Sequence, residues 1–319
     1  IANNAVDIAV EETPDFIHLD LTLSAGENCC RVVVKGTHTN VVELYINGQP
    51  QPLSEKQNTR TQRETLPTFS LQQAYDFINR VDFNDIRFIL DAARLNSALA
   101  AEGKTKKYGL NINGTFSDAV KNGLMSNDLL SKVIINTVAA SDARMGGAPV
   151  VAMSNFGSGN QGITATMPVV VVAEHLGVDE ETLARALSLS HLTAISIHSR
   201  YTRLSALCAA STAAMGAAAG MAWLFTRDIN TINTAIINMV SDITGMICDG
   251  ASNSCAMKVS SVVSSAFKAV LMAMQNSCAG ANDGIVCADV EQTINNLCRL
   301  VIKPMTLTDK EIISIMVAK

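Results

Sequence analysis

The spacing of apolar residues changes from two to about 3.6 near residue 66, and no other feature constrains the fold as strongly. Upstream of this point, apolar and polar residues alternate as they do in half-buried strands. The alternation covers residues 16–23, 29–35 and 40–46. Glycine-containing turn signals separate these segments. We therefore expect a three-stranded antiparallel meander that ends at Asn47 and Gly48, followed by a polar, exposed connector over residues 49–66.

Downstream of residue 66, apolar residues recur at helical spacing over most of the chain. The segments are 71–80, 85–101, 117–123, 128–140, 166–176, 180–197, 203–225, 229–246, 256–275 and 286–302. Residues 142–149 break the pattern. We predict an α+β fold: a small antiparallel β meander at the N-terminus, residues 1–66, followed by a large all-α domain, residues 67–319. Because residue 1 is Ile rather than Met, we expect the N-terminal portion to be a truncated α/β unit.

The composition excludes several classes of protein. Apolar residues make up 48% of the chain and aromatic residues 4%, which favours a core of closely packed small side chains. The net charge is −5 with scattered Lys and Arg, so nothing indicates a nucleic-acid partner. Eight cysteines among 319 residues do not make a disulfide scaffold, and no signal peptide opens the chain. We expect reduced thiols and a cytoplasmic location.

One uncharged segment, residues 204–225 between Arg203 and Arg227, imitates a membrane span. It contains only four strongly apolar residues, Leu204, Leu207, Leu224 and Phe225. Together these favour insertion by about 2 kcal/mol, and polar residues offset part of that. A helix buried in a soluble core explains the segment better, and an inner-membrane protein is the alternative.

Three cysteines could bind a metal. Cys248 and Cys255 bracket a turn of small polar residues in 246–258 (MICDGASNSCAMK), and Cys208 lies upstream in a predicted helical segment. Three thiolates can hold three irons of a 4Fe-4S cluster and leave the fourth iron open as a Lewis acid. Their spacing is not that of a standard metal motif, so burial as small apolar residues is the more common alternative.

A glycine-rich stretch, residues 153–168 (MSNFGSGNQGITATMP), precedes a predicted helix. Free N–H groups and the dipole at a helix N-terminus favour an anion, so a substrate carboxylate would fit. The candidate substrate-binding residues are Ser158, Gly159, Asn160, Gln161, Gly162 and Thr164. The stretch is neither a P-loop nor a dinucleotide-binding fingerprint, and a tight loop with satisfied polar groups is an equal alternative.

Other candidate residues are few. His38 lies in a predicted turn and is a candidate catalytic residue, whereas His191 and His198 share one face of a predicted helix and fit buried core histidines better. Arg144 and Lys258 are candidate carboxylate contacts. The remaining cysteines are interpreted as packing residues: Cys29, Cys30, Cys278, Cys287 and Cys298.

Four runs resemble the bacterial L-cysteine desulfidase family, which is related to the α-domain of iron-sulfur L-serine dehydratases. The runs are FILDAARLN, ASDARMGGAPVVAMSNFGSGNQGITATMPVVVVAEHLG, LSALCAASTAAMGAAAGMAW and GMICDGASNSCAMKVS. The resemblance extends over residues 1–319. It implies a serine dehydratase α-like helical domain in which Cys208, Cys248 and Cys255 ligate an oxygen-labile 4Fe-4S cluster.

The resemblance also implies a reaction. L-Cysteine and water would give pyruvate, ammonia and hydrogen sulfide without pyridoxal phosphate. The alternatives are an iron-sulfur L-serine dehydratase, and a non-enzymatic metal or thiol sensor that keeps the cluster fold. The implied partner is a small amino acid, with no nucleic acid and no membrane, and a broad apolar helical surface favours a homodimer.

The chain departs from the family at its beginning. Family members carry a Gly-Cys-Thr-Glu-Pro motif whose cysteine acts at the active site, and these 319 residues contain no such motif. A chain without that segment is expected to have little or no activity. The resemblance therefore makes the absent cysteine the first candidate for the base, with His38 the second.

Overall fold

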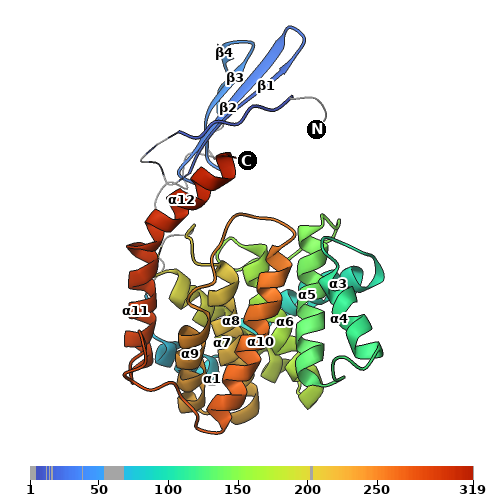
Figure 1. Cartoon of the computed structure of the whole chain (residues 1–319), viewed down its shortest axis with the longest axis vertical. Helices are drawn as coiled ribbons and strands as arrows, with labels where there is room; N and C mark the ends of the chain where they lie inside the picture. Colours follow the sequence, from blue (N-terminus) through green and yellow to red (C-terminus); the bar gives the residue numbers. More distant parts are fainter. Residues whose placement is uncertain are drawn as a thin grey trace. The chain divides into compact units, whose positions relative to one another are not determined.

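The computed structural model describes residues 5–53, except 12, 14, 16 and 38, and residues 68–318, except 202 and 203. The chain divides into two compact units, Ile1–Pro67 with Val317–Lys319, and Thr68–Met316. The first contains a small antiparallel sheet and the second is helical (Figure 1). The predicted α+β fold is confirmed.

The sheet is a meander with strand order β1-β2-β3-β4. Its strands are β1 (His18–Ala25), β2 (Asn28–Lys35), β3 (Val41–Ile46) and β4 (Gln49–Pro50). The two-residue strand β4 lies where we expected only an exposed connector. Asn47 and Gly48 both have positive φ, 50° and 76°, which is the conformation of a tight hairpin turn that pairs the chain with β3 again. Residues 54–66 of that connector lie outside the described residues.

The second unit consists of helices. Its helices are α1 (Leu71–Arg80), α2 (Phe83–Ile86), α3 (Leu90–Thr105), α4 (Ile112–Lys121), α5 (Leu129–Met145), α6 (Gly159–Leu176), α7 (Glu180–His198), α8 (Ala209–Thr226), α9 (Ile229–Ile243), α10 (Cys255–Met274), α11 (Val290–Ile302) and α12 (Met305–Val317). Aspartate side chains cap the first turns of α5, α7, α9 and α11 by accepting from free backbone N–H groups.

Several predicted helix boundaries are wrong. Helix α5 continues through Asp142 to Met145 instead of ending at residue 140, and α6 begins at Gly159 instead of residue 166. The glycines that suggested a loop are needed because the backbones approach closely: a Cβ at Gly162 would lie 1.9 Å from the carbonyl oxygen of Met153. Helix α8 begins at Ala209 rather than residue 203, and α12 was not expected.

Helix α8 lies at the centre of the helical unit and packs against α6, α7, α9 and α10. Its Ala and Gly residues let these helices approach closely, since a Cβ at Gly216 would lie 2.3 Å from the Ser190 carbonyl oxygen of α7. The segment that imitates a membrane span is therefore mostly a buried core helix. Within the described residues, α10 alone combines the length and hydropathy of a membrane span; half of it is buried in the unit, so this is weak evidence for a membrane.

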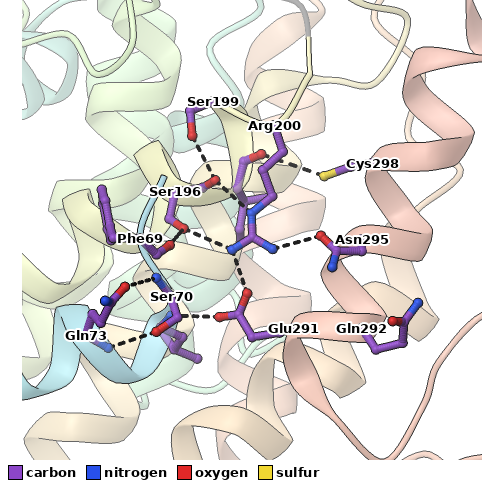
Figure 2. Close-up of polar contacts among 12 residues, drawn as sticks. Phe69, Ser70, Gln73, Ser196, Ser199, Arg200, Glu291, Gln292, Asn295 and Cys298 are labelled. Atoms are coloured by element: carbon purple, nitrogen blue, oxygen red, sulfur yellow. Dashed lines mark hydrogen bonds and ion pairs between the residues drawn. The ribbon is translucent and has the colours of Figure 1, made fainter. Parts of the chain in front are cut away.

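Arg200 clamps the C-terminal end of α7 to two other helices (Figure 2). Its guanidinium donates to the Glu291 carboxylate at 2.6 Å and to the Asn295 side-chain oxygen at 3.0 Å, both on α11. The other oxygen of Glu291 accepts from the backbone N–H of Leu71 at 2.7 Å, at the start of α1. This clamp holds the end of α7, where His198 lies.

Candidate active site

Two of the three candidate ligand cysteines flank an isolated antiparallel bridge between Leu207 and Ile247. The Cys208 N–H donates to the Met246 carbonyl at 2.9 Å, and the Cys248 N–H donates to the carbonyl of residue 206 at 2.7 Å. Side chains alternate along paired segments, so Cys208 and Cys248 point to the same face. They are diagonal neighbours, a relation in which Cα atoms lie about 7–8 Å apart.

The third cysteine, Cys255, is the first residue of α10 and closes a turn over residues 249–254. Its thiol donates to the Gly250 carbonyl at 3.4 Å and accepts from the Ser252 N–H at 3.4 Å. An ion pair between Asp249 and Lys258 joins the beginning of this turn to the first turns of α10. The turn thus brings Cys255 back toward Cys248.

The three thiols and Lys258 share one electrostatic neighbourhood. Burial raises the pKa of the Cys208 thiol to about 11; the N–H of Ala210 and the charge of Lys258 oppose this, whereas Cys248 and Cys255 add to it. Burial lowers the pKa of Lys258, but its hydrogen bond to Asp249 and its proximity to the thiols leave the pKa raised. An isolated Cys208 is therefore protonated at neutral pH, and a bound cation would have to displace that proton.

The donor set suits a thiolate-bound cluster, but its atoms are not gathered around a common point. Within the described parts of the chain, no three His, Cys, Asp or Glu side chains are arranged to hold a metal ion. The surroundings nevertheless favour an anionic group. Cys208 caps the N-terminus of α8, Cys255 opens α10, and helix N-termini and a lysine both stabilise thiolates.

The second predicted site begins with a tight turn over residues 155–158. Asn155 and Ser158 exchange both backbone hydrogen bonds, at 3.1 and 2.9 Å. The central residues, Phe156 and Gly157, have φ values of 48° and 86°. A bulky residue with positive φ is strained, and such residues cluster at functional sites. Ser158 then caps α6 by accepting from the Gln161 N–H at 3.3 Å.

The six predicted substrate-binding residues differ in accessibility. Ser158 and Asn160 are half-buried, whereas Gly159, Gln161, Gly162 and Thr164 are buried within the first turns of α6. Arg144 lies directly over Gly159, since a Cβ there would be 2.1 Å from the arginine Nε. The surface that could receive a carboxylate is therefore the first turn of α6, with Asn160 and the Arg144 guanidinium beside it.

The two predicted sites meet at one end of the helical unit. Gly109 lies between them: a Cβ on it would be 3.2 Å from the Asn253 side-chain oxygen, in the cysteine turn, and 3.3 Å from the Asp142 carbonyl oxygen. Asp142 is on the same last turns of α5 as Arg144. The tertiary structure thus places the cysteine turn and the start of α6 on either side of the end of α5.

A surface pocket of about 570 Å³ adjoins the cysteine turn. Its lining residues are Asp242, Ile243, Gly245, Met246, Ile247, Asp249 and Lys258. Lys258 lies here among the thiols and not at the start of α6. Of the two candidate carboxylate contacts, only Arg144 lies beside the glycine-rich turn.

His38, the predicted catalytic residue, lies outside the described residues. His198, which the sequence suggested was a core histidine, is indeed buried but lies between the two predicted sites. Its ring stacks on Phe156 of the 155–158 turn, at 4.4 Å between centroids, and on Tyr201, at 4.6 Å. The Tyr201 hydroxyl is hydrogen-bonded at 2.6 Å to Thr212, one helical turn after Cys208. The only sequence signal for this position was the seven-residue spacing from His191.

The chain is similar to known proteins over most of its length. A family model described as the serine dehydratase alpha chain matches residues 37–314. A UPF0597 protein of Klebsiella pneumoniae subsp. pneumoniae is 99% identical over 319 residues, which is all of this chain and 75% of that protein. The UPF0597 protein YhaM of Salmonella typhimurium is 52% identical over 314 residues, 97% of this chain and 72% of that protein.

Proposed function

The chain belongs to the serine dehydratase alpha chain family, and from this premise we propose that it is an L-cysteine desulfidase. The family supports a lyase-type enzyme that eliminates a group from the β-carbon of a small amino acid. The observation that supports an iron-sulfur lyase is the trio of thiols: Cys208 and Cys248 point to one face of the bridge, and the turn that ends at Cys255 lies beside them. The preference for sulfide as the leaving group comes from the resemblance to the desulfidases. The products would be pyruvate, ammonia and hydrogen sulfide.

In this proposal Cys208, Cys248 and Cys255 hold a 4Fe-4S cluster, and pyridoxal phosphate takes no part. When bound, the cluster supplies a Lewis acid at the iron that has no cysteine ligand, and a soft sulfur is a good partner for such an iron. The raised pKa of Cys208 means that cluster binding releases its proton.

The chain's own residues bind and orient the amino acid. Arg144 and the free N–H groups of the first turn of α6 would receive the α-carboxylate, and Asn160 lies beside them. Fixing the carboxylate orients the Cα–H bond for removal of its proton. Asn155 is buried, Phe156 and Ser158 are half-buried, and the His198 and Tyr201 rings stacked behind Phe156 would help to keep water away from that bond. The cysteine of the Gly-Cys-Thr-Glu-Pro motif and, after it, His38 remain the sequence predictions for the base, and a histidine of the helical unit is an alternative to both.

An L-serine dehydratase is the second candidate, because the matched family model carries that description. The elimination is the same with hydroxide as the leaving group. Turnover of L-cysteine and of L-serine by anaerobically reconstituted protein that carries the Gly-Cys-Thr-Glu-Pro segment separates the two, and we expect a higher kcat/KM for L-cysteine. A higher value for L-serine would reject the desulfidase. A reconstituted cluster without turnover of either would favour the third candidate, a metal or thiol sensor.

Anaerobic iron and acid-labile sulfide analysis tests the ligands independently of activity. The reconstituted wild type should contain about four irons per chain, as a 4Fe-4S cluster requires. Cys248→Ser should lose most of them, whereas Cys278→Ser, which changes an exposed thiol, should not. Equal iron in both variants would reject the ligand assignment.

We also propose that the protein is a cytoplasmic homodimer. Its partner would be a small amino-acid substrate, and it would bind neither nucleic acid nor a membrane.

A further inference from the structure

A continuous chain of buried hydrogen bonds connects His198 with the interior of the helical unit. Its members, in order, are His198, Gln161, Asn155, His191, Thr166 and Asn96, with successive distances of 2.8, 2.9, 3.0, 3.0 and 3.2 Å. All of them are buried. Because these buried side chains satisfy one another's hydrogen-bonding groups, each proton between them has one definite place.

The inner end of the chain determines the proton on His191. The Thr166 hydroxyl donates to the Gly162 carbonyl at 2.7 Å, since a carbonyl can only accept. Thr166 therefore accepts from its other neighbours, the Asn96 amide and the His191 Nε2. The His191 proton must be on Nε2. Burial lowers the pKa of His191 to about 4, so the ring is neutral and its Nδ1 carries a lone pair.

The outer end then determines the proton on His198. The Asn155 amide group donates to His191 Nδ1 and also, at 3.3 Å, to the His191 carbonyl, which again can only accept. The Asn155 side-chain oxygen accepts from the Gln161 amide group at 2.9 Å. The atom of Gln161 that faces His198 is therefore its oxygen, and His198 Nδ1 must donate to it.

We propose that these hydrogen bonds form a positioning relay that fixes a proton on Nδ1 of His198 and leaves Nε2 to accept the Cα proton in the elimination. The second half of this inference rests on the proposed function. His198 is placed for it, because its ring lies between Phe156 of the 155–158 turn and Tyr201. The Tyr201 hydroxyl is hydrogen-bonded to Thr212, one helical turn after Cys208. Gln161, Asn155 and His191 act through His198 and are positioning residues.

The proton balance of the step is simple. Nε2 takes the Cα proton as the Cα–H bond breaks, the electron pair forms the Cα=Cβ bond, and the Cβ–S bond breaks to release sulfide. The imidazolium then returns the proton to the sulfide or to water. The aminoacrylate product takes up water and loses ammonia in solution. No oxidant or reductant is needed.

Tautomers can be read without any cluster, from ¹⁵N NMR of histidine-labelled protein at pH 7. We expect the Nδ1–H form for His198 and the Nε2–H form for His191, assigned with His191→Gln and His198→Gln. In Gln161→Met, His198 should change to the Nε2–H form or a mixture, and in Gln161→Glu, which keeps an oxygen at that place, the Nδ1–H form should return. A wild-type His198 in the Nε2–H form would overturn the relay.

Turnover measurements test the second half of the proposal, that His198 Nε2 accepts the Cα proton. L-Cysteine turnover should fall at least tenfold in His198→Gln and in Gln161→Met. The matched control is Thr193→Val, a buried hydroxyl of α7 between the two histidines that has no hydrogen-bond partner within the described ranges. It should keep both tautomers and wild-type turnover, and thermal melting confirms folding. Wild-type turnover in His198→Gln would overturn its role as acceptor. These activities are measured on protein that carries the Gly-Cys-Thr-Glu-Pro segment. Correct tautomers in such a wild-type protein that is inactive on L-cysteine and L-serine would reject the proposed function and leave the relay standing.

Discussion

Leu207 and Ile247 pair in an isolated antiparallel bridge, and this pair directs the side chains of two cysteines that lie far apart in the sequence. The bridge needs only two backbone hydrogen bonds, from Cys208 and Cys248. The two bridge residues differ in burial, since Leu207 is 2% exposed and Ile247 is 44% exposed. The buried Leu207 side chain therefore anchors the bridge to the core.

Leu207→Ala should destabilise the helical unit more than Ile247→Ala. Truncating a buried leucine costs about 2–5 kcal/mol, because it removes apolar burial and leaves a cavity. Truncating the half-exposed Ile247 should cost less than about 1.5 kcal/mol. Urea denaturation measures both free energies of unfolding. Equal losses would mean that the bridge is not anchored through Leu207.

Gly216→Ala should destabilise the protein although alanine is the better helix former. The new methyl group would lie 2.3 Å from the Ser190 carbonyl oxygen, in backbone that cannot yield. Overpacking costs about 1–3 kcal/mol, which exceeds the gain of about 1 kcal/mol in helix propensity. Gly245→Ala, where no atom lies within 4 Å, should be neutral or slightly stabilising. Thermal unfolding of the two variants gives the comparison, and a stabilised Gly216→Ala would contradict the close packing of α8.

Glu291→Gln should weaken the clamp at the end of α7. The Arg200 side chain is 15% exposed, and the variant removes its only described ion-pair partner while keeping the shape of the side chain. We expect a loss of about 1–3 kcal/mol in the free energy of unfolding. Asp118→Asn makes the same chemical change in an exposed pair with Lys121 and should stay within about 0.5 kcal/mol of wild type. Similar losses in both variants would show that the buried ion pair of Arg200 and Glu291 stabilises the fold no more than an exposed pair does.

Stability should fall as the pH decreases from 7 to 5. Burial lowers the pKa of His191 from 6.5 to about 4, so between these values the unfolded chain binds more protons than the folded one. The free energy of unfolding from this residue should decrease by about 2 kcal/mol over that interval. Urea denaturation of His191→Gln should show lower stability at pH 7 but a shallower dependence on pH. Burial raises the pKa of Asp142, which acts in the opposite direction and is common to both proteins. Identical pH dependence in wild type and variant would contradict the neutral His191.

Arg144→Gln should raise KM for L-cysteine about tenfold or more, with a smaller change in kcat. A charged hydrogen bond to a carboxylate contributes about 1.5–3 kcal/mol, and the substrate uses it before and during the reaction. Arg87→Gln is the control, because Arg87 is 62% exposed and pairs with Glu180. Steady-state kinetics of anaerobically reconstituted proteins that carry the Gly-Cys-Thr-Glu-Pro segment measure both constants. An unchanged KM in Arg144→Gln would move the carboxylate site away from the start of α6.

The sequence by itself determined the architecture, because the period of apolar residues is a local property: alternation predicted β1, β2 and β3, and helical spacing predicted α1 and α7 nearly to the residue. It also proposed Cys208, Cys248, Cys255 and the glycine-rich stretch as candidates for the segments that carry chemistry. Helix ends beside glycines were wrong, since a glycine can mark a loop or a close contact between helices. Only the tertiary structure decides between the two, through atoms such as the Met153 carbonyl at Gly162.

The directions of side chains and the positions of protons on histidines were likewise decided by the tertiary structure. The bridge between Leu207 and Ile247 turns two thiols to one face, and pairing between distant segments leaves no trace in local spacing. Gln161 lies in the predicted carboxylate loop, yet burial and hydrogen bonds turn it toward His198. The tautomer of His198 follows from five further buried side chains, so it depends on partners that only folding brings within hydrogen-bonding distance.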